Sequence, residues 1–179
     1  MTQHTVIVPR ENVPSLDLPL VGGGTWSLAT QDAEHFTMVV FYRGYHCPIC
    51  KTQLNDLLSK KEAFAEIGVN VVAITSNDGD LTAKTVEEWG LDGLDVAHSL
   101  DLQTAAEWGL HISAGREGTT EPAHFSEPGL FLVRSDGTLY FSSIQTMPFA
   151  RPQFSDILGA AKFVIEKDYP ARGEIVNVQ

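Results

Sequence analysis

Two continuous apolar runs mark the centre of the chain. Residues 36–42 read FTMVVFY, and residues 69–74 read VNVVAI. Apolar runs of this length are typical of strands that are buried on both faces of a parallel sheet. Between the two runs, apolar residues recur at helical spacing over residues 54–65, and Gly68 is a suitable end for that helix. The pattern therefore predicts a strand–helix–strand unit whose two strands are parallel.

Three more helices are expected further along the chain. Asp78 or Asp80 can cap the first, and Asp101 can cap the second. The inward positions of the first are expected at Ala83, Val86 and Trp89. Pro152 opens the third, in which apolar residues form one stripe over residues 154–165. This last helix is expected to cover one face of the sheet.

Two hairpins are expected as well. Residues 16–21 and 25–28 flank a run of three glycines, which predicts a hairpin ahead of the core. Residues 130–134 and 138–143 flank Ser-Asp-Gly, a turn signal that predicts two antiparallel strands in the main sheet.

Two segments have no clear structural signal. Residues 111–127 show no period, and we expect a long loop there, which is either a functional segment or a solvated one. In the tail after Pro170, Ile175 and Val178 alternate with polar residues and could pair with a sheet edge or with a partner chain.

Cys47 and Cys50, the only cysteines, lie between the first strand and its helix. The spacing C-x-x-C places both on one face of the first helical turn, with Pro48 at a position that needs no N–H partner. The helix dipole favours a thiolate there and can lower a cysteine pKa from about 8.5 to roughly 3.5–7.5. Arg43 could add positive charge. This pattern is typical of a thioredoxin-like redox site.

Other interpretations of the pair stay open. Two buried cysteines can pack simply as small apolar side chains. A zinc site would need further ligands, and His46 adjoins the pair while His98, His111 or His124 could supply another. Haem attachment requires C-x-x-C-H, but Lys51 follows Cys50. We therefore expect no cofactor and no metal.

Three segments of the chain resemble a known family. They are FYRGYHCPIC, ITSNDGDLTAKTVEEWGLDGLDVAHSLDLQTAAEWGL and EPGLFLVRSDGTLYF, and they are similar to the redoxins of the alkyl hydroperoxide reductase/thiol-specific antioxidant (AhpC/TSA) group, in particular its peroxiredoxin-like branch. The resemblance implies an α/β, thioredoxin-like fold, with a central mixed sheet flanked by helices and an N-terminal hairpin extension. It also implies a nucleophilic Cys47 and a disulfide partner in Cys50.

The resemblance suggests the remaining site residues. It places Pro128 where the thioredoxin fold carries a cis-proline that faces the C-x-x-C. Our candidate catalytic residues are Cys47, Cys50 and Arg43. The candidate substrate-binding residues are Pro128, Tyr45, His46 and His124.

Two family positions differ in this chain. Typical peroxiredoxins carry P-x-x-x-(T/S)-x-x-C, where this chain has Val40 and Gly44, and a second arginine where it has Tyr140. We therefore predict a thiol-dependent oxidoreductase that prefers thiol–disulfide exchange and reacts slowly with peroxide. The alternatives are a true peroxidase that forms a sulfenic acid on Cys47, and a redoxin-fold protein that is non-catalytic or binds metal.

Composition and charge limit the number of domains, the possible partners and the expected cellular location. The 179 residues are 43% hydrophobic, which suits a single domain over residues 1–179 with its core at about 14–168. The net charge of −11 disfavours nucleic acid and anionic membranes. With no secretory h-region and no apolar span of about 20 residues, we expect a cytoplasmic protein. Its expected partners are a small oxidant or a protein disulfide, an external thiol reductant such as a thioredoxin or glutathione system, and, for assembly, a homodimer.

Overall fold

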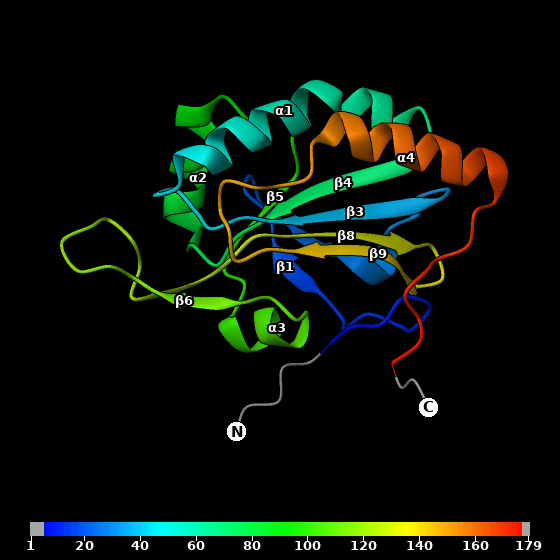
Figure 1. Ribbon diagram of the computed structural model, residues 1–179. Helices are drawn as coiled ribbons and strands as arrows, with labels where there is room; N and C mark the ends of the chain where they lie inside the picture. The colour runs from blue at the N-terminus through cyan, green and yellow to red at the C-terminus, as the bar shows by residue number, and fades with distance from the viewer. Residues whose placement is uncertain (1–5, 177–179) are drawn as a thin grey trace.

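A five-stranded mixed sheet forms the centre of the computed structural model, which describes residues 6–176 (Figure 1). Its spatial order is β5-β4-β3-β8-β9. The bounds are β3 (Phe36–Phe41), β4 (Val69–Ile74), β5 (Val96–Ala97), β8 (Gly129–Arg134) and β9 (Leu139–Ile144). Strands β3, β4 and β5 are parallel, whereas β8 is antiparallel to both β3 and β9. The predicted parallel unit and the predicted hairpin at 130–143 are therefore confirmed.

Helices cover both faces of this sheet. Helices α1 (Pro48–Ala65) and α4 (Phe154–Lys167) lie side by side over one face, and Trp89 of α2 (Gly79–Trp89) packs into the same core (Figure 1). Helix α3 (Leu102–Glu107) lies on the opposite face with the antiparallel pair β1 (Asp17–Pro19) and β2 (Thr25–Ser27), which a short 3-10 helix, η1 (Leu28–Thr30), follows. The expected α/β fold with an N-terminal hairpin is confirmed.

Side chains of β3 alternate between two cores. Met38 and Val40 contact the α1/α4 side, whereas Val39 and Phe41 contact the α3 side, and all four are essentially buried. This alternation explains why every residue of the strand except Thr37 is apolar: both of its faces are covered. Within residues 6–176, no helix is both long and apolar enough to cross a membrane.

The inward face of α2 differs from the prediction. Asp78, one of the two expected caps, caps the helix. The buried residues of the helix are Thr82, Thr85 and Trp89, whereas Ala83, which was expected to face inward, is exposed. The two threonines can be buried because each hydroxyl donates to a backbone carbonyl four residues earlier, at 2.6 and 2.8 Å.

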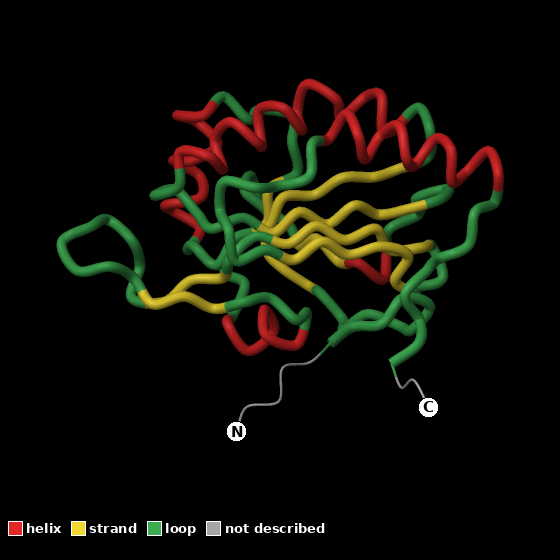
Figure 2. The backbone as a smooth tube through the Cα atoms, viewed as in Figure 1, coloured by secondary structure: helices red, strands yellow, loops and turns green. Residues whose placement is uncertain are grey.

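Residues 111–127 are not a simple loop. They form a hairpin arm in which β6 (Ile112–Ala114) pairs with β7 (His124–Ser126), so the prediction of a long unstructured segment is wrong for both ends (Figure 2). Strands of three residues are too short to show a period in the sequence. In the tail, Ile175 is exposed and lies outside any strand, and Val178 lies outside the described residues.

The peptide bond before Pro128 is trans, so the expected cis-proline is wrong. Glu127 and Pro128 link β7 directly to β8 in an extended path. The Glu127 N–H donates to the His111 carbonyl at 2.7 Å, and the Pro128 carbonyl accepts from the Gln145 N–H at 3.1 Å. Both backbone groups are thus used in bridging neighbouring segments, which favours a trans, strand-like connection here.

Candidate active site: a buried dithiol beside an arginine

The two cysteines lie where β3 leads into α1. Cys47 is the N-cap residue of α1, and its Sγ accepts a hydrogen bond from the Cys50 N–H at 3.3 Å. The Cys50 thiol donates to Cys47 Sγ at 2.7 Å, and the two cysteines are free, with no disulfide between them. Exposure is 1% for Cys47 and 0% for Cys50. The C-x-x-C is therefore a preformed pair that is nearly closed to solvent.

Arg151 is the cation nearest to these sulfurs, and the sequence analysis missed it. Its Nη2 lies 3.5 Å from Cys47 Sγ and its Nη1 lies 3.3 Å from Cys50 Sγ. The residue belongs to the segment between β9 and α4, 104 residues after Cys47. One guanidinium therefore contacts both sulfurs of the pair.

The environment separates the pKa values of the two cysteines. The pKa of Cys47 is lowered to about 5, first by the Cys50 thiol hydrogen bond, and also by the Cys50 N–H and by Arg151. The pKa of Cys50 is raised, first by burial and then by its hydrogen bond to Cys47. The pKa shifts therefore favour the thiolate on Cys47 and the protonated form on Cys50, and the role of Cys47 as the nucleophile stays a prediction.

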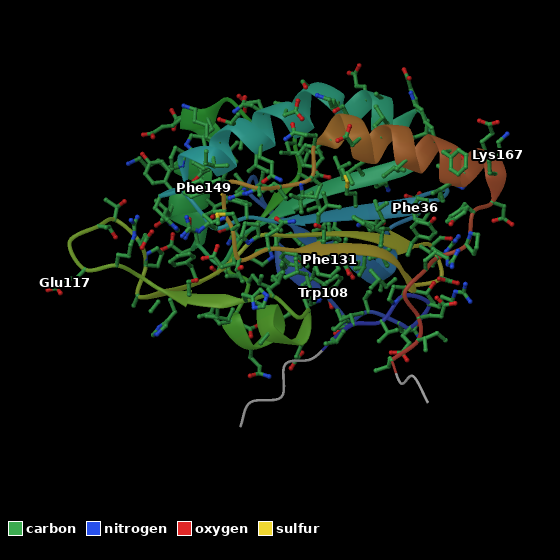
Figure 3. All side chains as sticks on the ribbon, in the orientation of Figure 1. Phe36, Trp108, Glu117, Phe131, Phe149 and Lys167 are labelled. Atoms are coloured by element: carbon green, nitrogen blue, oxygen red, sulfur yellow. The ribbon has the colours of Figure 1, made fainter. Side chains whose placement is uncertain are left out.

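A surface groove of about 260 Å³ leads to Arg151. Its walls come from the start of α1, from the segment after β9 and from the start of α4, and they include Ile49, Thr52, Gln53, Phe149, Arg151 and Phe154. Phe149 is 75% exposed and lies near the N-terminal end of α1 (Figure 3). The groove thus exposes one side of Arg151, the residue that contacts both sulfurs.

Arg43 contacts the hairpin arm. Its Nε lies 3.1 Å from Glu127 Oε2, its Nη2 lies 3.6 Å from Glu121 Oε1, and its guanidinium lies 4.7 Å from the centre of the Phe125 ring. Two carboxylates already balance its charge. Arg43 ties the loop before Cys47 to the arm, and its candidate catalytic role stays a prediction.

Gly44 has a structural reason to be glycine. Its φ is +130°, and a Cβ there would lie 2.5 Å from Asn77 Oδ1. The same Asn77 oxygen accepts a hydrogen bond from the Tyr45 N–H at 2.9 Å. The Asn77 side chain therefore occupies the space that a threonine or serine would need, and it fixes the loop that precedes Cys47.

The candidate substrate-binding residues have separate surroundings. Tyr45 stacks on Trp89, with 6.2 Å between ring centres, and donates from its hydroxyl to Glu88 at 2.5 Å. The His46 ring contacts the Phe125 ring at 4.7 Å, and burial lowers the pKa of His46. His124 is exposed at the start of β7. Tyr45 thus anchors the loop to α2, while His46 packs against the arm.

Tyr140 lies away from the dithiol. It packs against Phe36, the first residue of β3, with 5.0 Å between ring centres, whereas the cysteines follow the opposite end of that strand. Its hydroxyl donates to the Tyr169 carbonyl at 3.1 Å. Tyr140 therefore cannot act on Cys47. Among residues 6–176, no group of three or more His, Cys, Asp or Glu side chains is arranged to hold a metal ion.

Comparison with known proteins agrees with the fold. Residues 9–142 match the model of the AhpC/TSA family. Two Mycobacterium tuberculosis proteins, from strains CDC 1551 / Oshkosh and ATCC 25618 / H37Rv and both named "Putative peroxiredoxin", are 26% identical over 139 residues, which is 78% of this chain and 86% of theirs.

Solved structures are similar at lower identity. The Mycobacterium tuberculosis peroxidoxin BcpB superposes with a TM-score of 0.72 at 18% identity, covering 89% of this chain and 99% of that one. A peroxiredoxin-like protein from Aquifex aeolicus gives a TM-score of 0.72 at 11% identity, covering 89% and 88%. These structures share the fold, and the family match covers most of the chain. The protein belongs to the AhpC/TSA family, and it is a peroxiredoxin-like thiol protein with a C-x-x-C pair.

Proposed function

We propose that the protein is a thiol peroxidase that reduces small hydroperoxides with Cys47 and closes a Cys47–Cys50 disulfide in each cycle. The observation that carries this proposal is the position of Cys47: it is the N-cap residue of α1, its Sγ lies 3.5 Å from the Arg151 guanidinium and 2.7 Å from the Cys50 sulfur, and this arrangement lowers its pKa. With its pKa lowered to about 5, Cys47 is mainly thiolate at pH 7.

The proposed steps balance. The Cys47 thiolate attacks the terminal peroxide oxygen, the O–O bond breaks, and the released alkoxide or hydroxide takes a proton to leave as an alcohol or water. Cys50 then attacks the Cys47 sulfenic acid, so that the S–S bond forms and water leaves. Two electrons from an external dithiol, or from two monothiols such as glutathione, restore the pair by exchange.

The contacts change the expectation of a slow peroxide reaction. That expectation was based on the lack of a hydrogen-bond donor at Gly44 and at Tyr140, and in the structure neither residue provides a donor to Cys47. It did not count Arg151, whose guanidinium lies 3.5 Å from the attacking sulfur and can stabilise the negative charge that develops on the peroxide. The 1% exposure of Cys47 also favours a small oxidant over a folded protein disulfide.

Thiol–disulfide exchange is the second candidate. It is favoured by the C-x-x-C at the start of α1, with the second cysteine fully buried and protonated, because this arrangement suits the release of a mixed disulfide. In this case the substrate is a protein disulfide and the first product is a mixed disulfide on Cys47. The cytoplasmic location and the homodimer stay predictions.

Rapid mixing of the reduced protein with hydrogen peroxide and with a small alkyl hydroperoxide tests the proposal. We expect a second-order reaction that is absent in Cys47→Ser, and a sulfenic acid that dimedone traps in Cys50→Ser. The matched exchange assay is insulin reduction by the same preparation. Slow peroxide consumption that Cys47→Ser leaves unchanged, beside rapid insulin reduction, would replace peroxidase with exchange as the function.

A further inference from the structure

Arg151 is placed to act on both sulfurs of the dithiol, not on Cys47 alone. Each terminal nitrogen contacts one sulfur: Nη2 lies 3.5 Å from Cys47 Sγ, and Nη1 lies 3.3 Å from Cys50 Sγ. A planar guanidinium can bridge two acceptors in this way because its N–H groups point along fixed, diverging directions. A lysine ammonium would approach as a single point charge.

The rest of the side chain is held in position. Arg151 Nε donates to the Pro148 carbonyl at 2.8 Å, which fixes the guanidinium against its own loop. Nη1 also donates to Gln53 Oε1 at 2.5 Å, which fixes it against α1, one turn beyond Cys50. Preorganised donors of this kind need little rearrangement when charge develops nearby.

The charge of Arg151 is not balanced by an acid. Across residues 6–176, its guanidinium forms no ion pair with a carboxylate, and its polar partners are one carbonyl, one amide oxygen and the two sulfurs. Arg43, the other arginine near the site, is paired with Glu127 and Glu121. Arg151 is therefore the cation whose field acts on the dithiol.

We propose that Arg151 is a catalytic residue that carries the negative charge on whichever sulfur holds it, first Cys47 and then Cys50. This inference rests on the proposed function. Before oxidation, the guanidinium stabilises the Cys47 thiolate. During closure, Cys50 loses its proton and its sulfur attacks the Cys47 sulfenic acid; the S–O bond breaks, the hydroxyl leaves with a proton as water, and Nη1 stabilises the transient Cys50 thiolate. During reduction, an external thiolate bonds to one sulfur, the S–S bond breaks, and the departing sulfur receives the electron pair beside the same guanidinium.

The pKa directions agree with this role. Burial raises the pKa of Cys50 well above its ordinary value, so its thiolate is costly without a nearby cation. Arg151 opposes that rise, and it also contributes to the lowered pKa of Cys47. One residue thus acts on both halves of the catalytic cycle.

The first test needs no peroxide. The thiolate absorbance of reduced Arg151→Gln is measured against pH beside the wild type, with Arg134→Gln as the matched control, since Arg134 lies at the far end of β8 over Phe36 and Tyr140. A cation within about 4–6 Å lowers an acid pKa by roughly 1–3, so at pH 5 the Cys47 thiolate fraction should fall about fivefold or more in Arg151→Gln. Arg134→Gln should match the wild type.

The disulfide equilibrium gives a second readout. Loss of thiolate stabilisation favours the oxidised form, so the equilibrium constant for oxidation by glutathione at pH 7 should rise about tenfold in Arg151→Gln, which corresponds to roughly 30 mV. Arg151→Lys keeps the positive charge but loses the diverging N–H groups with which the guanidinium contacts two sulfurs at once. It should restore most of the Cys47 thiolate while leaving closure of the disulfide slow, as followed by quenched-flow mass spectrometry after a single peroxide turnover.

These outcomes separate the inference from the proposed function. An unchanged thiolate titration and glutathione equilibrium in a folded Arg151→Gln, with thermal unfolding as the folding check, would overturn the role of Arg151 even if the wild type reduces peroxide. Shifts in both readouts support it even if the wild type reduces only disulfides. Fast formation of the Cys47–Cys50 disulfide in Arg151→Lys would show that the guanidinium is needed only for the Cys47 thiolate, and it would refute the role of Arg151 at Cys50.

Discussion

Replacing Arg43 by methionine should destabilise the protein and leave the Cys47 thiolate unchanged. Arg43 is 16% exposed and Glu127 is 7% exposed, and their contact at 3.1 Å is an ion pair between an internal loop and the hairpin arm. Glu127 also accepts a hydrogen bond from the Ser113 hydroxyl at 2.7 Å. Removing Arg43 leaves the Glu127 carboxylate buried with only that neutral donor and the more distant charges of the arm.

The magnitude follows from the burial of this pair. Breaking a buried ion pair by removing one partner costs about 3–5 kcal/mol, and partial exposure here favours the lower end, about 3 kcal/mol. For a chain of this size, 1 kcal/mol corresponds to roughly 2–4 °C in Tm, so Arg43→Met should lower Tm by about 6–12 °C. Combining it with Glu127→Gln should recover more than half of that loss, because the unpaired charge is then absent.

Differential scanning calorimetry of the reduced protein measures the change in Tm of Arg43→Met and of the double variant, with Arg134→Met as the control. Arg134 makes cation–π contacts with Phe36 and Tyr140, at 5.5 and 4.9 Å, that contribute about 0.5–1 kcal/mol, so its loss should lower Tm by no more than about 4 °C. A Tm drop for Arg43→Met that is no larger than this control would refute the ion-pair reasoning. A clear rise in the Cys47 pKa would instead show that Arg43 acts on the thiolate.

Three further outcomes are expected. Iodoacetamide should label Cys47 before Cys50 at pH 6.5, and its rate should fall as pH drops through about 5, because only the thiolate reacts; equal labelling of both cysteines would contradict the assigned roles. Gly44→Ala should destabilise the protein by about 1–3 kcal/mol in urea unfolding, since the new Cβ meets Asn77 at a positive φ, whereas Gly159→Ala, in open space on α4, should be neutral or stabilising. In Cys50→Ser, one peroxide equivalent should leave a sulfenic acid on Cys47 instead of a disulfide, and loss of peroxide reactivity in this variant would count against Cys47 as the first nucleophile.

The local sequence determined the core of the fold. Apolar runs without alternation identified β3 and β4 because both faces of these strands are covered, and the C-x-x-C identified the start of α1. The hairpin arm was missed because strands of three residues carry too little pattern to show a period. The inward threonines of α2 were missed because their burial depends on hydroxyl bonds to the helix backbone.

Arg151 was missed because no motif links it to the cysteines, but the observed strand directions show how it reaches them. Strand β8 is antiparallel to both β3 and β9, so β9 runs in the same direction as β3. The C-terminal ends of β9 and β3 therefore lie at the same end of the sheet, and Cys47 follows β3 at that end. A search for cations directly after β9 would have found Arg151. Arg43 was chosen for its proximity in sequence, but its guanidinium contacts the arm.

A single turnover with limiting peroxide tests the central claim most directly. Reduced protein is mixed with one equivalent of hydrogen peroxide in the absence of other thiols, quenched with acid, and analysed by intact mass while the remaining peroxide is titrated. The account predicts that the peroxide is consumed and that the protein loses two hydrogens as the Cys47–Cys50 disulfide forms, with neither change in Cys47→Ser. Unconsumed peroxide beside an unchanged dithiol, in a preparation that still reduces insulin, would contradict it.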